Sequence, residues 1–204
     1  MNPSDDLARN RATVAGYDAS AENYAAVTDH APTPEHVEAL ERLAAGVGAG
    51  GRVLEVASGP GWDADRLDAM GVQVRRTDLS EGFIAFQRER GRTIEQLDLI
   101  TGDLGGPWDG LMALYVIQHI GRDLVDGVIR RIATALRPGG TLLMSWQEGE
   151  GEKTSTDAEG TYQIVRWREA DMVDCLARHG LAVEWRSLFH GREADWITVI
   201  ARRS

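Results

Sequence analysis

The stretch VLEVASGPGWDAD occupies residues 53–65 and determines the expected fold class. Its apolar run is typical of a buried strand. The run contains an acidic residue, Glu55, and is followed by a Gly-Pro-Gly turn at 59–61. A helix is expected directly after the turn, at 62–70. A strand, a glycine-rich turn and a helix in this order begin a βαβ unit, whose turn can approach a bound ligand closely. The stretch therefore predicts an α/β protein with a ligand site at this turn.

Working outward, short apolar strands alternate with helical patterns, which is typical of a parallel sheet covered by helices on both faces. We expect strands at 52–57, 72–77, 94–99, 110–116 and 141–146, and helices at 62–70, 81–90, 123–136 and 167–179. The last two β-rich stretches, AVEWRSLFH and DWITVIARR, are joined by a short polar link. They predict a C-terminal antiparallel hairpin on a mostly parallel, seven-stranded sheet flanked by helices.

The length of 204 residues fits one domain, which we expect to span 15–204. Residues 1–14 bury little in the sequence pattern and are expected to be disordered or loosely packed. Helical segments are predicted within 15–48, where Thr33 caps a helix that ends at Gly48. The polar stretch at 148–165 is expected to form a mobile surface loop.

Charge and composition exclude several classes of function. Asp and Glu total 32 against 22 Lys and Arg, and a net charge of -10 disfavours nucleic-acid binding. We expect a cytoplasmic protein without membrane contact, because no signal or transmembrane segment is visible. The single cysteine, Cys175, excludes an internal disulfide, and we expect no metal. The oligomeric state is not indicated.

The turn also satisfies the dinucleotide fingerprint G-x-G-x-x-G/A through Gly59, Gly61 and Ala64. In that interpretation a pyrophosphate lies against the N-terminus of the following helix, where backbone N–H groups favour an anion. Asp78, near the end of the next strand, fits the acidic residue that binds a ribose hydroxyl at such sites. A nucleotide-dependent oxidoreductase is therefore an alternative to be weighed.

Carboxylates around the turn argue against that alternative. Glu55 precedes the turn and Asp63 and Asp65 follow it, so a phosphate would meet three negative charges. Each would repel it by about 1 kcal/mol at ~4 Å in water, although simple helix capping also explains the two aspartates. Small oxidoreductases of this fold also use a tyrosine four residues before a lysine, whereas Gly149 stands four residues before the one lysine, Lys153.

Carboxylates at three successive strand ends, Glu55, Asp78 and Asp98, favour a cationic ligand with hydroxyl groups. Four motifs then resemble, in order, those of the small class I S-adenosylmethionine-dependent methyltransferases. They are VLEVASGPG at 53–61, TDLS at 77–80, EQLDL at 95–99 and LRPGG at 136–140. The resemblance extends from about Tyr17 to Arg202. It implies a Rossmann-like fold, S-adenosyl-L-methionine as cofactor, and methyl transfer to an oxygen or nitrogen of a small molecule by in-line displacement.

The resemblance also implies cofactor contacts. The backbone at Ala57, Gly59 and Gly61 would approach the methionine and ribose portions, with Glu55 behind them. Ala57 stands where the family has its first glycine, and its methyl group is tolerated if φ stays negative. The remaining implied contacts are Asp78 and Leu79 at the ribose, Asp98 and Leu99 at the adenine, Tyr115 facing the methyl donor, and Tyr17 and Tyr24 on a lid formed by 15–48. Core packing is an alternative for Tyr24.

Substrate residues are expected just past the fourth strand, where Gln118 and His119 lie. His119 is the candidate catalytic residue, because a neutral imidazole can take a proton from a hydroxyl or ammonium group. A histidine that packs against the cofactor or caps the next helix is an equal alternative, since methyl transfer from a sulfonium can need positioning alone. Trp146 and His30 are further substrate candidates. A non-catalytic S-adenosylmethionine-binding protein is the alternative function, and the sequence does not identify the methyl acceptor.

Overall fold

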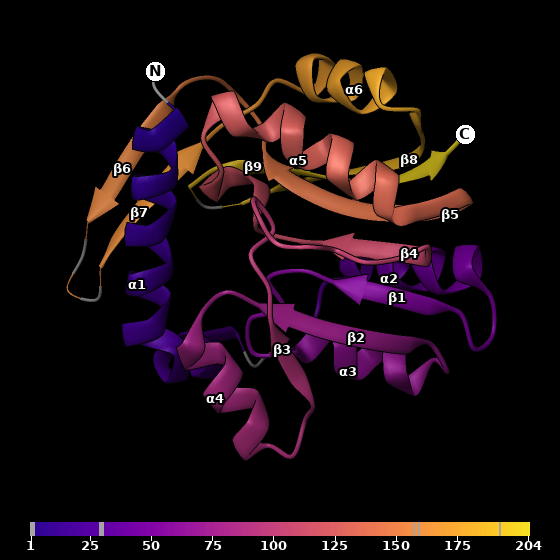
Figure 1. Ribbon diagram of the computed structural model, residues 1–204, viewed down its shortest axis with the longest axis horizontal. Helices are drawn as coiled ribbons and strands as arrows, with labels where there is room; N and C mark the ends of the chain where they lie inside the picture. Colours follow the sequence, from indigo (N-terminus) through magenta and orange to yellow (C-terminus); the bar gives the residue numbers. More distant parts are fainter. Residues whose placement is uncertain (1–2, 29–30, 157, 159, 192) are drawn as a thin grey trace.

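The computed structural model describes residues 3–28, 31–156, 158, 160–191 and 193–204. Seven strands form one sheet in the order β3-β2-β1-β4-β5-β9-β8 (Figure 1). The five strands from β1 to β5 are parallel, and β8 and β9 add an antiparallel hairpin beside β5. Their bounds are β1 Arg52–Glu55, β2 Gln73–Asp78, β3 Ile94–Gln96, β4 Trp108–Ala113, β5 Leu136–Gln147, β8 Leu181–His190 and β9 Asp195–Arg203. The predicted fold class is confirmed.

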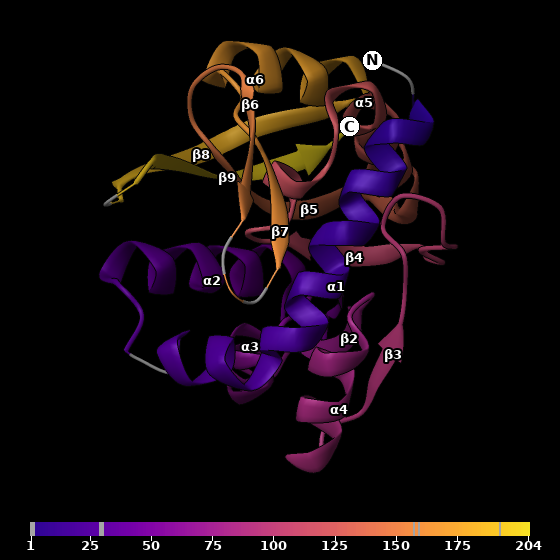
Figure 2. The ribbon, with the colours of Figure 1, turned by 90° about the vertical axis from the view of Figure 1, so that its left-hand side faces the viewer.

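Helices cover both faces of the sheet, as Figure 2 shows for α2 and α3 on one side and α5 on the other. On one face, apolar residues of α5 and α6, including Cys175, form the larger core with β4, β5 and β9. On the other, α2 and α3 pack on the sheet through residues such as Leu40 and Leu67. The bounds are α2 Pro34–Val47, α3 Trp62–Ala69, α4 Glu81–Glu89, α5 Arg122–Ala135 and α6 Glu169–Arg178.

The prediction for residues 1–14 is wrong from Pro3 onward, because helix α1 (Pro3–Thr28) already begins there. In Figure 1 this indigo helix runs along the edge of the sheet where the strand carboxyl ends lie. The first half of its inner face is polar: Asn10 and Thr13 are buried, Asn10 donates to the His119 carbonyl at 3.0 Å, and Thr13 Oγ1 accepts the Gln163 N–H at 2.9 Å. This half of the helix is held by buried hydrogen bonds, so it has no apolar periodicity for a sequence pattern to detect.

The prediction of a mobile loop at 148–165 is also wrong. This segment contains a two-stranded antiparallel hairpin, β6 (Glu152–Thr156) and β7 (Thr161–Val165). The hairpin lies beside α1 in both ribbon views, and Val165 is fully buried (Figures 1 and 2). The outer strand β6 consists mainly of exposed polar residues, which explains why the sequence resembled a loop.

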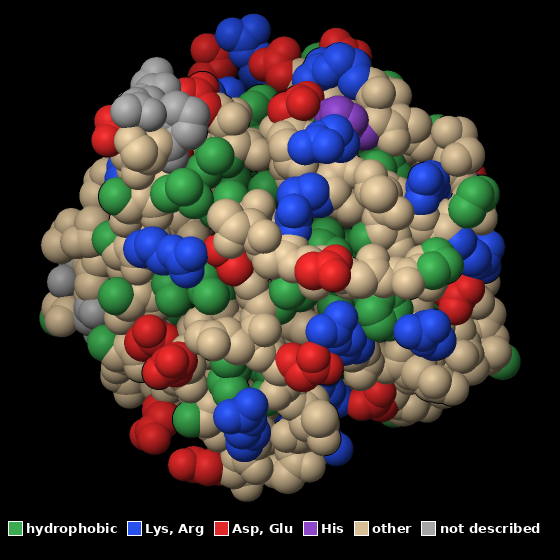
Figure 3. Space-filling model, in the orientation of Figure 1, with side chains coloured by type: hydrophobic (Ala, Val, Ile, Leu, Met, Phe, Trp, Pro, Cys, Tyr) green, Lys and Arg blue, Asp and Glu red, His purple; other side chains and the backbone are tan. Residues whose placement is uncertain are grey.

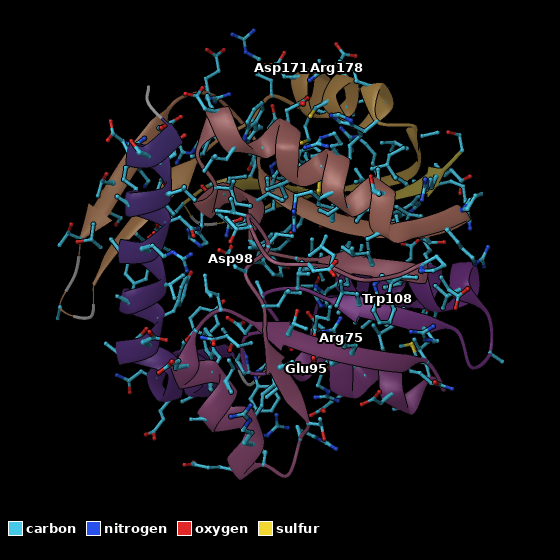
Figure 4. The ribbon with its side chains drawn as sticks, in the orientation of Figure 1. Arg75, Glu95, Asp98, Trp108, Asp171 and Arg178 are labelled. Atoms are coloured by element: carbon cyan, nitrogen blue, oxygen red, sulfur yellow. The ribbon has the colours of Figure 1, made fainter. Side chains whose placement is uncertain are left out.

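Acidic and basic side chains are interspersed over the face shown in Figure 3. One ion pair joins β2 to β3, where Arg75 Nη2 lies 2.8 Å from Glu95 Oε2 and the guanidinium lies 5.8 Å from the centre of the Trp108 ring (Figure 4). Although α1 has 26 residues, no helix within the described ranges is long and apolar enough to cross a membrane.

Candidate functional site

A cavity of about 440 Å³ lies at the carboxyl ends of the parallel strands, and α1 forms part of its wall. Figure 4 shows the labelled Asp98 in this region, between α1 and the strand ends. This is the edge at which open α/β sheets bind ligands. The predicted site residues that line the cavity are Tyr17, Tyr24, Glu55, Ala57, Gly59, Asp78, Leu79, Asp98, Leu99, Tyr115 and His119.

Glu55, Asp78 and Asp98 form what we call the carboxylate end of the cavity. Burial raises the pKa of Glu55 to about 8, although a hydrogen bond from the Ser58 hydroxyl opposes this shift. Burial likewise raises the pKa of Asp78 to about 6, against hydrogen bonds from the backbone N–H groups of Gly59 and Ser80, both at 2.8 Å. Both groups therefore keep their protons to a higher pH than a free carboxyl group does, and a positive charge bound beside them would favour their ionised forms.

Asp98 differs because it already has a cationic partner. Its Oδ2 lies 2.9 Å from Arg11 Nη2 of α1, and its Oδ1 accepts the Ile100 N–H at 2.9 Å. The Arg11 side chain is about half exposed, so this ion pair contributes little stability by itself. It does attach α1 to the loop after β3 at the edge of the cavity.

The turn after β1 does not have the backbone expected for Ala57, whose φ is +52° rather than negative. The two flanking N–H groups explain why the chain bends here. Val56 N–H bonds to the Met112 carbonyl at 3.0 Å on β4, whereas Ser58 N–H bonds to the Thr77 carbonyl at 2.9 Å on β2. A left-handed conformation costs a non-glycine residue about 1–2 kcal/mol, so the turn is strained.

Gly61 is not among the residues lining the cavity in the described part of the chain. A Cβ atom at this position would lie 2.6 Å from the Gln87 amide, and φ is +84°. Gln87 Nε2 donates to the Gly59 carbonyl at 2.8 Å and to Ser58 Oγ at 2.9 Å. Glycine at 61 thus leaves room for the Gln87 side chain, which supports the turn. No sequence pattern indicated this role for Gln87, a polar residue buried on α4.

The two aspartates after the turn have separate roles. Asp63 lines the cavity. Asp65 instead pairs with Arg76 at 2.7 Å and Arg90 at 2.6 Å, and these bonds lower its pKa against the opposing effect of burial. The predicted cluster of acidic residues at the turn therefore includes Asp63 but not Asp65.

His119 lines the cavity with both ring nitrogens engaged. Its Nδ1 lies 2.7 Å from the Gln163 carbonyl, which can only accept, so Nδ1 carries the proton. Its Nε2 then accepts from the Tyr17 hydroxyl at 2.9 Å. Burial lowers the pKa of His119 to about 4. These contacts favour the packing alternative for His119 over the role of general base.

Two predicted substrate residues, Gln118 and Trp146, do not line the cavity. Gln118 is buried, and its Nε2 donates to the Tyr115 carbonyl. Trp146 is fully buried in the larger core, so its predicted place at the substrate site is wrong. Alternation along β5 explains this: Ser145 Oγ accepts the Tyr115 N–H at 2.9 Å, so the next side chain points to the opposite face. His30 lies outside the described residues.

Three further residues that line the cavity, His36, Tyr115 and Phe189, form what we call the aromatic end. His36 Nε2 lies 2.7 Å from Asp63 Oδ1, and its Nδ1 lies 3.3 Å from the Tyr115 hydroxyl. Tyr115 is 41% exposed with φ of +55°, and Phe189 is 47% exposed. The sequence indicated the start of α2 through Thr33 but not where the His36 side chain points.

The comparisons with known proteins agree with this geometry. Residues 54–142 match the family model described as a methyltransferase domain. A curated relative, the ubiquinone biosynthesis O-methyltransferase of Xanthomonas campestris pv. campestris (strain B100), is 27% identical over 104 residues. That match covers 47% of this chain and 43% of the relative, so the chain spans less than half the length of the curated relatives it matches.

Solved structures share the fold over nearly the whole chain. The 1,6-didemethyltoxoflavin-N1-methyltransferase of Burkholderia thailandensis, with S-adenosylhomocysteine bound, has a TM-score of 0.75 at 19% identity and covers 100% of this chain and 91% of its own. The magnesium protoporphyrin IX methyltransferase of Synechocystis PCC 6803 has a TM-score of 0.71 at 19% identity, over 97% and 99%. At these identities the solved structures show the fold, and the family model adds a match to a methyltransferase domain over residues 54–142.

Proposed function

We propose that the protein binds S-adenosyl-L-methionine at the carboxylate end and transfers its methyl group to an oxygen or nitrogen of a small molecule at the aromatic end. The observation that carries the proposal is that one cavity joins the two ends. S-adenosylmethionine supplies an activated methyl group on a sulfonium, and the protein has to hold it in line with the incoming nucleophile.

The residues of the carboxylate end fit this cofactor. Each Asp78 oxygen accepts one backbone N–H and retains a free lone pair for a ribose hydroxyl. A sulfonium bound beside Glu55 and Asp78 would lower their raised pKa values, so cofactor binding and ionisation of the two carboxyl groups are linked. Asp98 and Leu99 remain the proposed adenine contacts, and the 15–48 segment with Tyr17 and Tyr24 the proposed lid.

A small acceptor is supported by the shape of the aromatic end. It is bordered by α2, by the loop after β4 and by β8, with the exposed rings of Tyr115 and Phe189. Exposed rings beside a polar group suit a planar molecule with an ionisable hydroxyl or amine. The relatives named above methylate acceptors of small-molecule size, which agrees with this proposal.

Calorimetric titration tests cofactor binding directly. We expect S-adenosylmethionine and S-adenosylhomocysteine to bind, and NAD not to bind. Asp78→Asn should weaken binding by about 100-fold, or about 2.7 kcal/mol, because the amide places a donor where the ribose needs an acceptor. The matched control Glu95→Gln, on β3 outside the cavity, should change affinity less than twofold. Absence of S-adenosylmethionine binding would overturn the proposal.

Turnover is tested by following release of S-adenosylhomocysteine with a panel of phenols, carboxylic acids and aromatic amines. We expect release with at least one planar acceptor. Tight cofactor binding with no release across the panel would instead support the non-catalytic binding protein.

A further inference from the structure

We propose that His36, oriented by Asp63, is the general base that removes the proton of the methyl acceptor. This inference rests on the proposed function and identifies a catalytic residue within that site. It also selects acceptors with an ionisable O–H or N–H group, because a base has no role for an acceptor that carries no proton.

The arrangement is assembled from three separate elements that meet at the cavity. His36 lies in the first turn of α2, Asp63 in the first turn of α3, and Tyr115 in the loop after β4. His36 Nε2 is 2.7 Å from Asp63 Oδ1, and the imidazole and Tyr115 rings are nearly parallel at 6.1 Å between centroids. All three side chains belong to residues that line the cavity.

The hydrogen bonds determine which nitrogen is available. An ionised carboxylate can only accept, so Asp63 fixes the proton of neutral His36 on Nε2. The lone pair therefore lies on Nδ1, which is 3.3 Å from the Tyr115 hydroxyl. That hydroxyl belongs to an exposed side chain and makes a long bond, so an acceptor hydroxyl can replace it by exchanging one O–H donor for another.

His119 shows the opposite arrangement, although it borders the same cavity. Its Nδ1 proton is bound to the Gln163 carbonyl, and its Nε2 lone pair is bound to Tyr17. These two bonds connect His119 to α1 and to β7 within the structure. Of these two cavity histidines, His36 is the one that can exchange its partner for a substrate.

The proposed step balances without another reactant. The acceptor oxygen or nitrogen forms a bond to the methyl carbon, the carbon–sulfur bond breaks, and its electron pair goes to sulfur. The acceptor proton moves to His36 Nδ1. The resulting imidazolium is stabilised by Asp63 through the Nε2–H bond and afterwards loses its proton to water.

The charged and titratable groups around His36 come from four elements. Arg66 of α3 lies 3.6 Å from the same Asp63 oxygen, and Glu35 of α2 lines the cavity. Tyr115 follows β4. Tyr24 of α1 is buried, and this burial together with the negative charge of Asp63 raises its pKa. The cavity residues from β8 and β9 are Ser187, Phe189 and Thr198, which carry no charge.

A titration followed by NMR tests the position of His36 without any acceptor. S-adenosylmethionine and S-adenosylhomocysteine differ by the methyl group and its positive charge. If Nδ1 faces that methyl group, the titration midpoint of His36 should be lower in the S-adenosylmethionine complex by about 0.5 pH unit, the Coulomb effect of one charge at ~6 Å in water. His36→Gln assigns the resonance by its disappearance.

The internal control is His179, which pairs with Asp126 at 3.1 Å outside the cavity and should titrate equally in both complexes. Equal midpoints for His36 in the two complexes would overturn the inference. If S-adenosylmethionine does not bind at all, the proposed function fails as well, so the two failures are distinguishable.

Kinetics give a second test with the acceptor found by the panel. His36→Gln should lower kcat by about 100-fold or more at neutral pH, and the remaining rate should increase with pH as the acceptor ionises in solution. Asp63→Asn should give a smaller loss and move the pH profile, because the amide no longer stabilises the imidazolium. A His36→Gln variant that keeps its kcat, or that loses cofactor affinity more than tenfold, would contradict the base role.

Discussion

His36 and His119 border one cavity but lie in different surroundings. His119 is buried, with one nitrogen bound to the β7 backbone and the other to Tyr17 of α1. His36 is held on one side by Asp63 and on the other faces the hydroxyl of Tyr115, a partly exposed residue. The same side chain thus joins structural elements in one place and presents a lone pair in the other. Both histidines lie near the strand ends, so their roles differ because their ring nitrogens have different partners.

The largest expected effect concerns the pH dependence of stability at His119. Its folded pKa of about 4 lies below the ordinary value of 6.5, so the unfolded chain binds a proton more readily. The stability associated with neutral His119 is present above pH 6.5 and is lost as pH falls toward 4, by about 3 kcal/mol in total. His119→Asn should remove this loss, as measured by urea unfolding at pH 7 and pH 4.

Titration of two carboxyl groups changes the stability with pH in the opposite direction to His119. Their contribution has to be separated from that of His119. Glu55 and Asp78 have raised pKa values, so their contribution is present at low pH and is lost as pH rises through about 8 and about 6. Both groups are common to the wild type and the variant, so their effects cancel in the difference. Identical pH dependence in the two proteins would show that His119 is not held neutral.

The two tyrosines that contact the histidines give a matched pair of variants. Tyr17→Phe should lower the free energy of unfolding by about 1 kcal/mol, because it removes the 2.9 Å hydrogen bond to the buried His119 Nε2 and leaves only the Gln118 amide at 3.2 Å as a donor. Tyr115→Phe should change it by less than about 0.5 kcal/mol, since water can replace an exposed hydroxyl. Chemical denaturation at pH 7 measures both. Equal losses of unfolding free energy would mean that water cannot replace the tyrosine hydroxyl at either histidine.

The smallest expected effect lies in the turn at the carboxylate end, away from both histidine hydrogen bonds. Ala57→Gly should stabilise the protein by about 0.5–1 kcal/mol, because relief of the left-handed conformation exceeds the entropy that glycine adds to the unfolded chain. Thermal unfolding detects this change. Gly59→Ala is the reverse control, since its φ of +55° should make alanine destabilising. A less stable Ala57→Gly variant would indicate that the Ala57 methyl group makes a contact that outweighs the strain.

Local patterns in the sequence were sufficient for the sheet, for the C-terminal hairpin and for the carboxylate end. Glu55, Asp78 and Asp98 could be brought together in advance because each follows a parallel strand, and parallel strands end at the same edge of the sheet. In the apolar strands and amphipathic helices, the spacing of the apolar residues indicates which side chains are buried.

Only the tertiary structure decided the rest. Helix α1 buries a polar face, so its position depends on partners such as Gln163, far away in the chain. The register of β5 determines the direction in which the Trp146 side chain points. Hydrogen bonds to two different strands cause the positive φ of Ala57. His36 and Asp63 meet because α2 and α3 pack on the same face of the sheet. A periodic pattern specifies which face of an element is buried, whereas contacts between side chains of separate elements depend on how those elements pack together.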